Sequence, residues 1–519
     1  MGEFMLQINQ LTLTHTIDLI DIVTDFNLVL NTGDKAVLIG EEGNGKSTLL
    51  KYIYDSRLVS DYIEGKGYIT LNNETLAYLA QELPSQYAKL TIYELFSSND
   101  LFWEYSSNEL NQLARQFHFD PSIYYSDQVL SSLSGGEKVK VQLMNILLQT
   151  VSVLLLDEPS NDIDIQTLDV LEKLIIQWEG IVLFISHDET LIERCANEVI
   201  HMERICRKKE SKVTVANMDY ATYVTSRTTL IERNNQQAVY DARAKKIRDE
   251  KYNRVYQSVQ HALRKVSRQS PEEAKNLKDK MHTVKSMGKR FEKEDESMKY
   301  RMDVEESINF QFNENNHSID EGKIVLDYYC PQLSVDDKVL ARDIQLCVKG
   351  SQKICIVGAN GCGKTTLIKH IMEQLSQRSD ISVQYMPQNY LDLLNGDITP
   401  VDYIVENSGE SKQKVMTYLG ALKFTYDEMA HSVVKLSGGQ KAKLFLICMT
   451  LSNANVLILD EPTRNFSPLS QPVIRDMLSN FKGSIISVSH DRKYIRQVCD
   501  KIYALTQNGL IETDKDEFI

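Results

Sequence analysis

The chain has 519 residues, of which 42% are hydrophobic and 25% are charged, and its formal net charge is −14. These values predict a soluble globular protein of two to four domains. The chain contains no run of 18 apolar residues and no opening signal peptide, so we expect neither a membrane span nor secretion. Its eight cysteines are scattered without a Cys-x-x-Cys pair, which favours reduced thiols in a cytosol over disulfides or a zinc site.

The first motif along the chain is a phosphate-binding loop. Val37–Ile39 is a short buried-strand run that leads into Gly40-Glu-Glu-Gly-Asn-Gly-Lys46-Ser47, and a helical stretch follows. This is GxxxxGK[ST] in the strand–loop–helix context that it requires. We expect Lys46 to reach the β- and γ-phosphates and Ser47 to ligate Mg²⁺. The nucleotide-binding residues predicted here are Gly40, Gly43, Asn44, Gly45, Lys46, Ser47 and Thr48.

Three further motifs follow in the first 201 residues. Leu133–Glu137 reads Leu-Ser-Gly-Gly-Glu and opens a helical stretch. A predicted strand then ends in Asp157 and Glu158, of which Asp157 suits Mg²⁺ and Glu158 suits the attacking water. A third predicted strand, Ile181–Ile185, is followed by His187. A pair of acids is often only a strand-end turn, but the P-loop, the Ser-Gly-Gly motif and the acid pair occur in this order, which argues against that alternative.

The connector, residues 202–321, is predicted to be largely helical. It contains one proline and one glycine, and Arg268–Pro271 reads as a turn between two long antiparallel helices with a tip near 265–273. Val255, Val259, Leu263 and Val266 fall on one helical face, as do Leu277, Met281, Val284 and Phe291.

Charge sets the connector apart from the rest of the chain. Between Arg243 and Arg290 there are fifteen Lys and Arg against five Asp and Glu, which is +10 on a chain of −14. A basic hairpin on an acidic body suggests a phosphate-rich partner, most simply RNA. The alternative is a solvated spacer between two domains, since charge runs are common on long helices. The predicted RNA-contacting residues are Arg264, Lys265, Val266, Arg268 and Gln269.

Residues 322–519 repeat the first motif set. Ser134 and Ser437, Asp157 and Asp460, and His187 and His490 are all separated by 303 residues, which indicates an internal duplication. The separation of the two P-loop lysines is 318, so the first copy carries 15 extra residues before Ser134. The second set consists of Gly358, Asn360, Gly361, Cys362, Gly363, Lys364, Thr365, Thr366, Gln388, Ser437, Gly438, Gly439, Asp460, Glu461 and His490.

This ordered set resembles the ATPase domain of ABC proteins, so the expected fold is two tandem α/β P-loop domains joined by a helical hairpin. The resemblance implies that Ser134–Gly136 and Ser437–Gly439 are signature motifs, each capping ATP held by the other domain. It makes Gln81 and Gln388 Q-loop residues that sense Mg²⁺ and water, and His187 and His490 switch histidines. Asp164 matches the D-loop aspartate, but its counterpart is Ser467. By the same resemblance, Glu158 and Glu461 are expected to be catalytic together with these glutamines and histidines. The expected Mg²⁺ ligands are Ser47, Thr365, Gln81, Gln388, Asp157 and Asp460.

Two ATPase units around a helical linker resemble the ABC-F family of ribosome-associated ATPases. The resemblance implies a cytoplasmic monomer, without a membrane or DNA partner, that binds the large ribosomal subunit, 23S rRNA and P-site tRNA. Arg464–Pro468 and the small insertion in the first unit look like the branch that protects ribosomes from lincosamides, pleuromutilins and group A streptogramins. A housekeeping translation factor is the main alternative. A transporter ATPase fits the basic linker poorly, and DNA-repair ABC ATPases usually insert coiled coils inside one unit.

Overall fold

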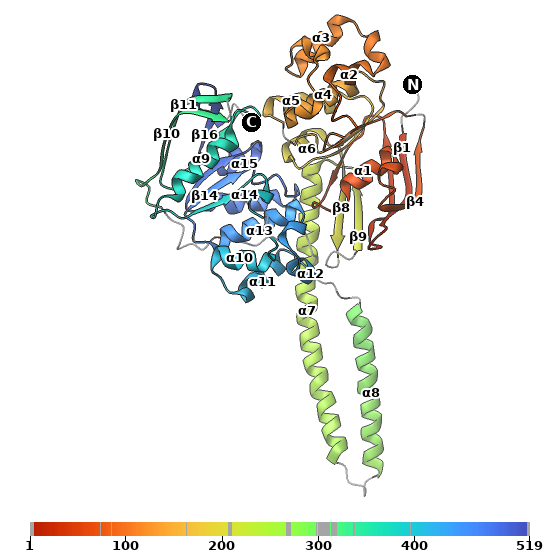
Figure 1. The fold of residues 1–519 in the computed structure, drawn as a ribbon. Coiled ribbons are helices and arrows are strands. Elements are labelled where there is room, and N and C mark those ends of the chain that lie inside the picture. The colour runs from red at the N-terminus through yellow and green to blue at the C-terminus, as the bar shows by residue number, and fades with distance from the viewer. Residues whose placement is uncertain are drawn as a thin grey trace. The chain divides into compact units, whose positions relative to one another are not determined.

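The computed structural model describes residues 5–72, 74–84, 86–161, 163–205, 210–265, 271–296, 298, 312, 319–335, 338–394 and 396–515. The chain forms two units, one made of residues 1–220 and 305–519 and the other of residues 221–304. The first unit contains two α/β domains and the second is helical, as the sequence predicts (Figure 1). Within the described residues we find no helix that has both the length and the apolar character of a membrane span.

The first domain is built on a six-stranded sheet with the order β5-β6-β7-β3-β8-β9. All neighbouring strands are parallel except β8 and β9. Strands β3, β6 and β7 are five-residue runs buried at every position, as expected of strands covered on both faces. The strands are β3 (Lys35–Ile39), β5 (Leu76–Leu79), β6 (Val153–Asp157), β7 (Ile181–Ile185), β8 (Glu198–Ile205) and β9 (Glu210–Ala216). The helices are α1 (Lys46–Tyr54), α2 (Ile92–Ser97), α3 (Ser107–Gln116), α4 (Gly135–Leu147), α5 (Ile165–Gln177) and α6 (Glu189–Cys195).

An antiparallel sheet, in the order β2-β1-β4, completes the first domain. It consists of β1 (Met5–His15), β2 (Asp21–Asn31) and β4 (Ile63–Leu71). At this place the described residues of the second domain form two strands, β10 (Ile324–Val335) and β11 (Lys338–Lys349). Lys46 lies 30 residues before the start of β5, whereas Lys364 lies 19 residues before the start of the equivalent strand of the second domain, β13 (Val383–Met386). Eleven of the 15 extra residues of the first copy therefore precede β5, where the chain forms β4, and no separate subdomain results.

The second domain repeats the six-stranded sheet in the order β13-β14-β15-β12-β16-β17. In both domains the strand before the P-loop is flanked by a strand on each side, so the carboxyl ends of three parallel strands meet at one edge. The strands are β10 (Ile324–Val335), β11 (Lys338–Lys349), β12 (Lys353–Val357), β13 (Val383–Met386), β14 (Val456–Asp460), β15 (Ser484–Val488), β16 (Lys501–Thr506) and β17 (Gly509–Thr513). The helices are α9 (Lys364–Ser376), α10 (Pro400–Ser408), α11 (Lys412–Ala421), α12 (Tyr426–Ala430), α13 (Gly438–Leu451), α14 (Gln471–Ser479) and α15 (Arg492–Val498).

Buried ion pairs join the two domains. Arg475 on α14 lies 2.6 Å from the carboxylate of Glu189, and Arg492 on α15 lies 2.8 Å from that of Glu172. All four side chains are at most 8% exposed. Lys493 adds a pair with Glu189 at 3.0 Å. In these three pairs the acids come from the first domain and the bases come from the second.

The predicted boundary at 201/202 is wrong. Residues 198–205 and 210–216 form β8 and β9, which pair with each other at the edge of the first sheet. The charged residues between Glu203 and Glu210 hide these strands in the sequence, whereas pairing with β3 gives β8 its place. The predicted start of the second domain at 322 is also late, because Phe312 packs on Phe481 and Ile319 lies in that domain's core.

The helical unit consists of α7 (Tyr220–Lys265) and α8 (Pro271–Glu296), separated by residues 266–270, which lie outside the described residues. The two helices run antiparallel, since Arg248 pairs with Asp295 at 2.6 Å while Tyr252 meets Phe291 with ring centroids 5.8 Å apart. At 1.5 Å per residue, the 46 residues of α7 extend about 69 Å.

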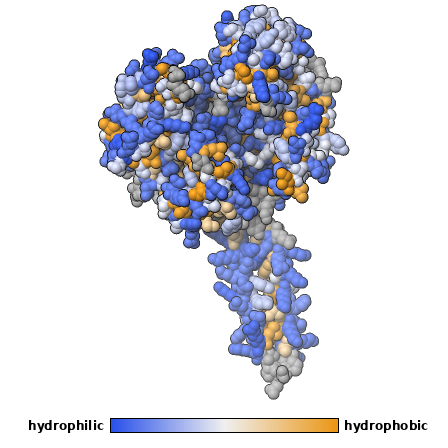
Figure 2. Space-filling model, viewed as in Figure 1, coloured by the Kyte–Doolittle hydropathy of each residue, from blue (hydrophilic) through white to orange (hydrophobic). Residues whose placement is uncertain are grey.

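The apolar seam between the two helices is partly as predicted. On α8, Leu277, Met281, Val284 and Phe291 are among the least exposed residues. On α7, however, Val255 is 50% exposed, and the side chains on the seam are Tyr252, Tyr256, Val259 and Leu263. The two tyrosines are one turn apart and bury more area than a valine. Figure 2 shows a narrow apolar strip between the helices and hydrophilic residues over the rest of their visible face.

Candidate functional site

The first P-loop follows β3 and ends at the first turn of α1. The Nζ of Lys46 donates hydrogen bonds to the carbonyl oxygens of Gly40, at 2.8 Å, and Glu41, at 3.0 Å, so the lysine lies inside its own loop. Gly45 caps α1 with φ +90°, a conformation that an L side chain rarely adopts. A Cβ at Gly40 would overlap the carbonyl oxygen of Met202. Both glycines are therefore required by the geometry of the loop.

Ser47 and Asp157 form a compact pair of oxygen ligands. The hydroxyl of Ser47 donates to Asp157 Oδ1 at 2.9 Å, and the hydroxyl of Tyr78 donates to Oδ2 at 3.0 Å. Burial raises the pKa of Asp157, while the two hydrogen bonds oppose that shift. A hydroxyl and a carboxylate next to a phosphate cradle fit Mg²⁺, which prefers oxygen ligands and usually takes only one or two carboxylates together with substrate phosphates. The described residues contain no cluster of three or more His, Cys, Asp or Glu that could hold a metal by itself.

Glu158 and His187 meet at the ends of β6 and β7. His187 Nε2 lies 3.1 Å from Glu158 Oε1, and its Nδ1 lies 2.9 Å from the carbonyl oxygen of Phe466 in the second domain. Both partners accept hydrogen bonds, so a ring nitrogen that carries a proton can donate to the partner that it faces. Burial alone would raise the pKa of Glu158, but the charge and hydrogen bond of His187 outweigh it and lower that pKa. Glu158 has φ +51°, a strained backbone of the kind found at functional sites.

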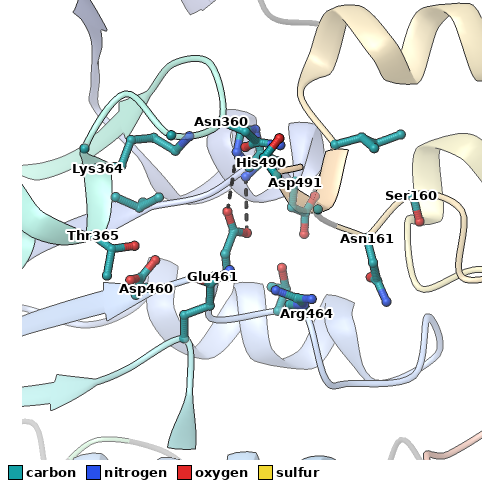
Figure 3. Close-up of a pocket in the computed structure, with 18 of the residues that line it drawn as sticks. Ser160, Asn161, Asn360, Lys364, Thr365, Asp460, Glu461, Arg464, His490 and Asp491 are labelled. Atoms are coloured by element: carbon teal, nitrogen blue, oxygen red, sulfur yellow. Dashed lines mark hydrogen bonds and ion pairs between the residues drawn. The ribbon is translucent and has the colours of Figure 1, made fainter. Parts of the chain in front are cut away.

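The second P-loop repeats this arrangement (Figure 3). Lys364 Nζ donates to the carbonyl oxygens of Gly358, at 2.7 Å, and Ala359, at 3.1 Å. Thr365 donates to Asp460, whose pKa is raised by burial and lowered in part by this bond. The fit to Mg²⁺ is the same as in the first domain.

The contact between Glu461 and His490 differs from the contact between Glu158 and His187. His490 Nε2 lies 3.9 Å from Glu461 Oε1, and the backbone N–H of His490 donates to Oε2 at 3.3 Å (Figure 3). Burial and the neighbouring Asp460 raise the pKa of Glu461 to about 8. Like Glu158, it has positive φ, +54°. The two glutamates therefore occupy equivalent positions with opposite pKa shifts.

The signature serines cap helices. Ser134 and Ser437 each accept a hydrogen bond, at 3.3 Å, from the backbone N–H three residues on, and Glu137 and Gln440 reach back in a capping box. The first turn of each helix also contains glycines, and backbone N–H groups at a helix N-terminus can bind an anion; in α13 the N–H of Gly439 donates to the carboxylate of Glu42. Gly136 is buried in the first turn of α4.

Both domains line a cavity of about 820 Å³. Ser134 and Gly135 of the first domain face Lys364, Thr365 and Gln388 of the second across it. Asp460, Glu461 and His490 also line it. Next to the first P-loop, a cavity of about 410 Å³ is lined by Lys46, Ser47, Thr48, Gln81, Glu158 and His187. Ser437 and Gly439 line a separate cavity of about 210 Å³. Val266, Arg268 and Gln269 lie outside the described residues, whereas Arg264 and Lys265 are exposed at the end of α7.

The sequence interpretation missed the walls beside each phosphate cradle. His15, Ile22 and Tyr62 line the cavity of the first site, and Val335 and Leu340 line that of the second. Ile22 and Leu340 pack on Gly45 and Gly363, respectively, the glycines that cap the P-loop helices. These aromatic and aliphatic surfaces are suited to a nucleotide base. The turn between the two strands that precede each P-loop is the sequence signal that could have indicated these wall residues.

The domains match a known sequence family. The model described as ABC transporter matches residues 23–161 and 341–464, together just over half of the chain. The chain is 27% identical to ATP-binding protein Uup of Buchnera aphidicola subsp. Acyrthosiphon pisum, over 94% of this chain and 78% of that protein. It is 26% identical to Uup of Escherichia coli K12, over 93% and 78%. It is 27% identical to ABC transporter F family member 2 of Arabidopsis thaliana, over 75% and 54%.

Solved structures share the fold at lower identity. One is a crystal structure of archaeal ribosome recycling factor aABCE1 with stalk protein aP1, with a TM-score of 0.56 at 16% identity, covering 97% of this chain and 90% of that one. Another is RNase-L Inhibitor, with a TM-score of 0.58 at 15% identity, covering 97% and 91%. The two P-loop domains agree with the family match, and the chain belongs to the ABC family of ATPases.

Proposed function

We propose that this protein is an ATP-dependent ribosome-binding factor whose helical unit contacts RNA near the peptidyl-transferase centre and protects the large subunit from antibiotics that bind there. The observation that carries the proposal is a basic segment, residues 243–290 with a net charge of +10, within an antiparallel helix pair that follows the first ATPase domain and precedes the second in the sequence. The likeness in fold to a ribosome recycling factor supports it. In this proposal the partners are 23S rRNA and P-site tRNA, and the protein works in the cytoplasm.

Two ATP sites would form between the domains. In the first, Lys46 and the P-loop amides would hold the phosphates, with the Ser437–Gly439 end of α13 opposite. In the second, Lys364 and its loop would do so, opposite Ser134–Gly136. When bound, Mg²⁺ would add positive charge beside the β- and γ-phosphates, held by Ser47, Gln81 and Asp157 in one site and by Thr365, Gln388 and Asp460 in the other.

In each site a glutamate would polarise the attacking water, and a histidine would orient that carboxylate. The 3.1 Å contact between His187 and Glu158 fixes the first pair. Because ATP would touch both domains, its binding favours their closed arrangement, and hydrolysis removes that preference. The change in closure would alter how the helical unit engages the ribosome.

Among the described bases between Arg243 and Arg290, ion pairs engage only three, and this favours RNA binding over an inert spacer. Lys245, Arg248 and Arg290 are paired with Asp249, Glu294 and Asp295 at one end of the hairpin. Towards the other end, Arg264, Lys265, Lys275 and Lys278 form no ion pair with any described residue. Their charge is therefore available to phosphates.

Drug protection is favoured over general translation by two features. The second D-loop reads Arg464-Asn-Phe-Ser-Pro468, and the first copy carries the strand β4 rather than a helical arm. A housekeeping translation factor is the second candidate, since the relatives named above are described only as ATP-binding or ABC-F proteins.

The first prediction concerns both glutamates. Glu158→Gln combined with Glu461→Gln should retain ATP binding but lose most turnover, because each site loses its proton acceptor while the phosphate cradle stays intact. Turnover and equilibrium ATP binding are measured on purified protein, and co-sedimentation should show the double variant trapped on ribosomes. Near-normal turnover would exclude these residues as the bases.

The second prediction concerns pH. Glu461, with a pKa of about 8, must lose its proton before it can accept one, whereas the lowered pKa of Glu158 keeps that residue ionised. In Glu158→Gln, where only the second site works, kcat/KM for ATP should rise with pH and level off above about 8. In Glu461→Gln it should change little over the same range. Identical profiles for the two variants would contradict this difference.

The third prediction tests RNA contact. Arg264→Gln with Lys265→Gln should weaken ribosome binding and make its dependence on log[salt] shallower by about 2, about one per lost phosphate contact. The matched control is Arg243→Gln with Lys246→Gln, which removes the same charge from exposed positions of α7 about 30 Å away. Equal effects in both variants would favour a diffuse field over a specific contact.

The fourth prediction separates protection from general translation. Expression in a susceptible bacterium should raise the inhibitory concentration of at least one drug of the peptidyl-transferase centre, and shortening residues 266–270 should abolish this while ATPase activity survives. A small-subunit drug serves as the control. If no such drug is affected, and deletion from the native host slows translation without drug, the translation-factor assignment replaces protection.

A further inference from the structure

The first P-loop carries two acids that the second lacks. Glu41 and Glu42 correspond to Ala359 and Asn360 at the 318-residue offset of the P-loops. Carboxylates in a phosphate-binding loop repel the phosphates that the loop binds. Their contacts show where these side chains lie.

Glu42 lies at the N-terminus of the opposing signature helix. The backbone N–H of Gly439 donates a hydrogen bond to Glu42 Oε2. A Cβ added at Gly438 would come within 2.8 Å of both carboxylate oxygens, so the carboxylate lies against the first turn of α13. Only glycine leaves room for it there.

Glu41 reinforces this contact. Its carboxylate lies 2.5 Å from Lys443 Nζ on the same helix, and the two side chains are only 20% and 13% exposed. The equivalent lysine of the first signature helix, Lys140, lies over the ring of Phe119 at 5.7 Å. The pairing with P-loop acids is thus confined to the first site.

The cavities differ accordingly. In the second site one cavity of about 820 Å³ reaches from Lys364 to Ser134 and Gly135. In the first site, the cavity with Lys46 and the cavity with Ser437 and Gly439 are separate, and Glu42 lines both. The side chain of Glu42 therefore stands between the phosphate cradle and the signature helix.

We propose that Glu42 is a built-in competitor of the γ-phosphate of ATP at the first site, and that Glu41 and Lys443 hold it there. This rests on the proposed sites between the domains. A helix N-terminus binds carboxylate and phosphate oxygens through the same N–H groups and dipole, so only one of the two anions can occupy it. ATP must displace Glu42, whereas ADP lacks the phosphate that would reach α13. Arg204 lines both cavities and is a cation that can receive the displaced carboxylate.

The competitor should discriminate between ATP and ADP. At the first site the competitor weakens ATP binding more than ADP binding, so the second site fills first. General repulsion by an acid in the P-loop would instead weaken both nucleotides to the same extent. The ratio of the two effects separates these explanations.

The test uses the full chain with Lys364→Ala, which leaves the first P-loop as the working one. Calorimetric titration compares a non-hydrolysable ATP analogue with ADP, with and without Glu42→Asn, which installs the residue of the second loop. Release of one charge-assisted hydrogen bond should tighten the analogue by about tenfold or more and ADP by less than about threefold. Glu42→Gln, which keeps the side-chain length and removes the charge, should give a smaller shift in the same direction.

The matched control moves the acids to the other loop. In a Lys46→Ala chain, Ala359→Glu with Asn360→Glu should weaken the analogue at the second site more than ADP. Equal shifts for the two nucleotides, or no shift in Glu42→Asn, overturn the competitor while leaving the ATP sites intact. If neither P-loop lysine affects binding of the analogue, the proposed sites are wrong and the competitor with them.

Discussion

The buried ion pairs between the two domains are the constraint on which both sites depend. Glu172 and Arg475 occupy equivalent positions of the two copies, and so do Glu189 and Arg492, each 303 residues apart. The pairs then form crosswise, Arg475 with Glu189 and Arg492 with Glu172. Two first copies would bring carboxylates together and two second copies would bring guanidinium groups together, at a high cost for buried charge. The duplicated domains therefore select each other, which aligns each P-loop with the opposite signature helix.

The same divergence makes the two sites chemically unequal. Asp164 accepts a hydrogen bond from Thr167 N–H at 2.9 Å and caps α5, whereas Ser467 bonds to Ser470 and α14 begins without a side-chain cap. Near Ser467, the carbonyl of Phe466 engages His187, which in turn lowers the pKa of Glu158. Glu461 lacks so close a histidine contact, and burial raises its pKa. The loss of one aspartate thus accompanies a difference in the ionisation of the two proposed bases.

The helical unit is organised by charge as well as by its apolar seam. Arg248 packs over the ring of Phe291 at 4.5 Å and pairs with Asp295, so this cation helps to join α7 to α8. The bases near the far end have no such task among the described residues, and their mutual repulsion is tolerated only where solvent or a polyanion screens it. A few bases of the hairpin therefore join its two helices, and others are open to the proposed RNA partner.

The sequence by itself determined the P-loops, signature helices, paired acids and long helices, because each depends on local spacing or on a run of buried residues. The duplication offset also indicated the missing D-loop aspartate before any contact was known. The sequence alone led to a wrong boundary at 201/202, because β8 and β9 are defined by the pairing of these strands with each other and of β8 with β3. Only the tertiary structure decided the position of Glu42, the crosswise ion pairs and the opposite pKa shifts of Glu158 and Glu461. Each of these depends on atoms brought together from distant parts of the chain, and local pattern carries no information about such distances.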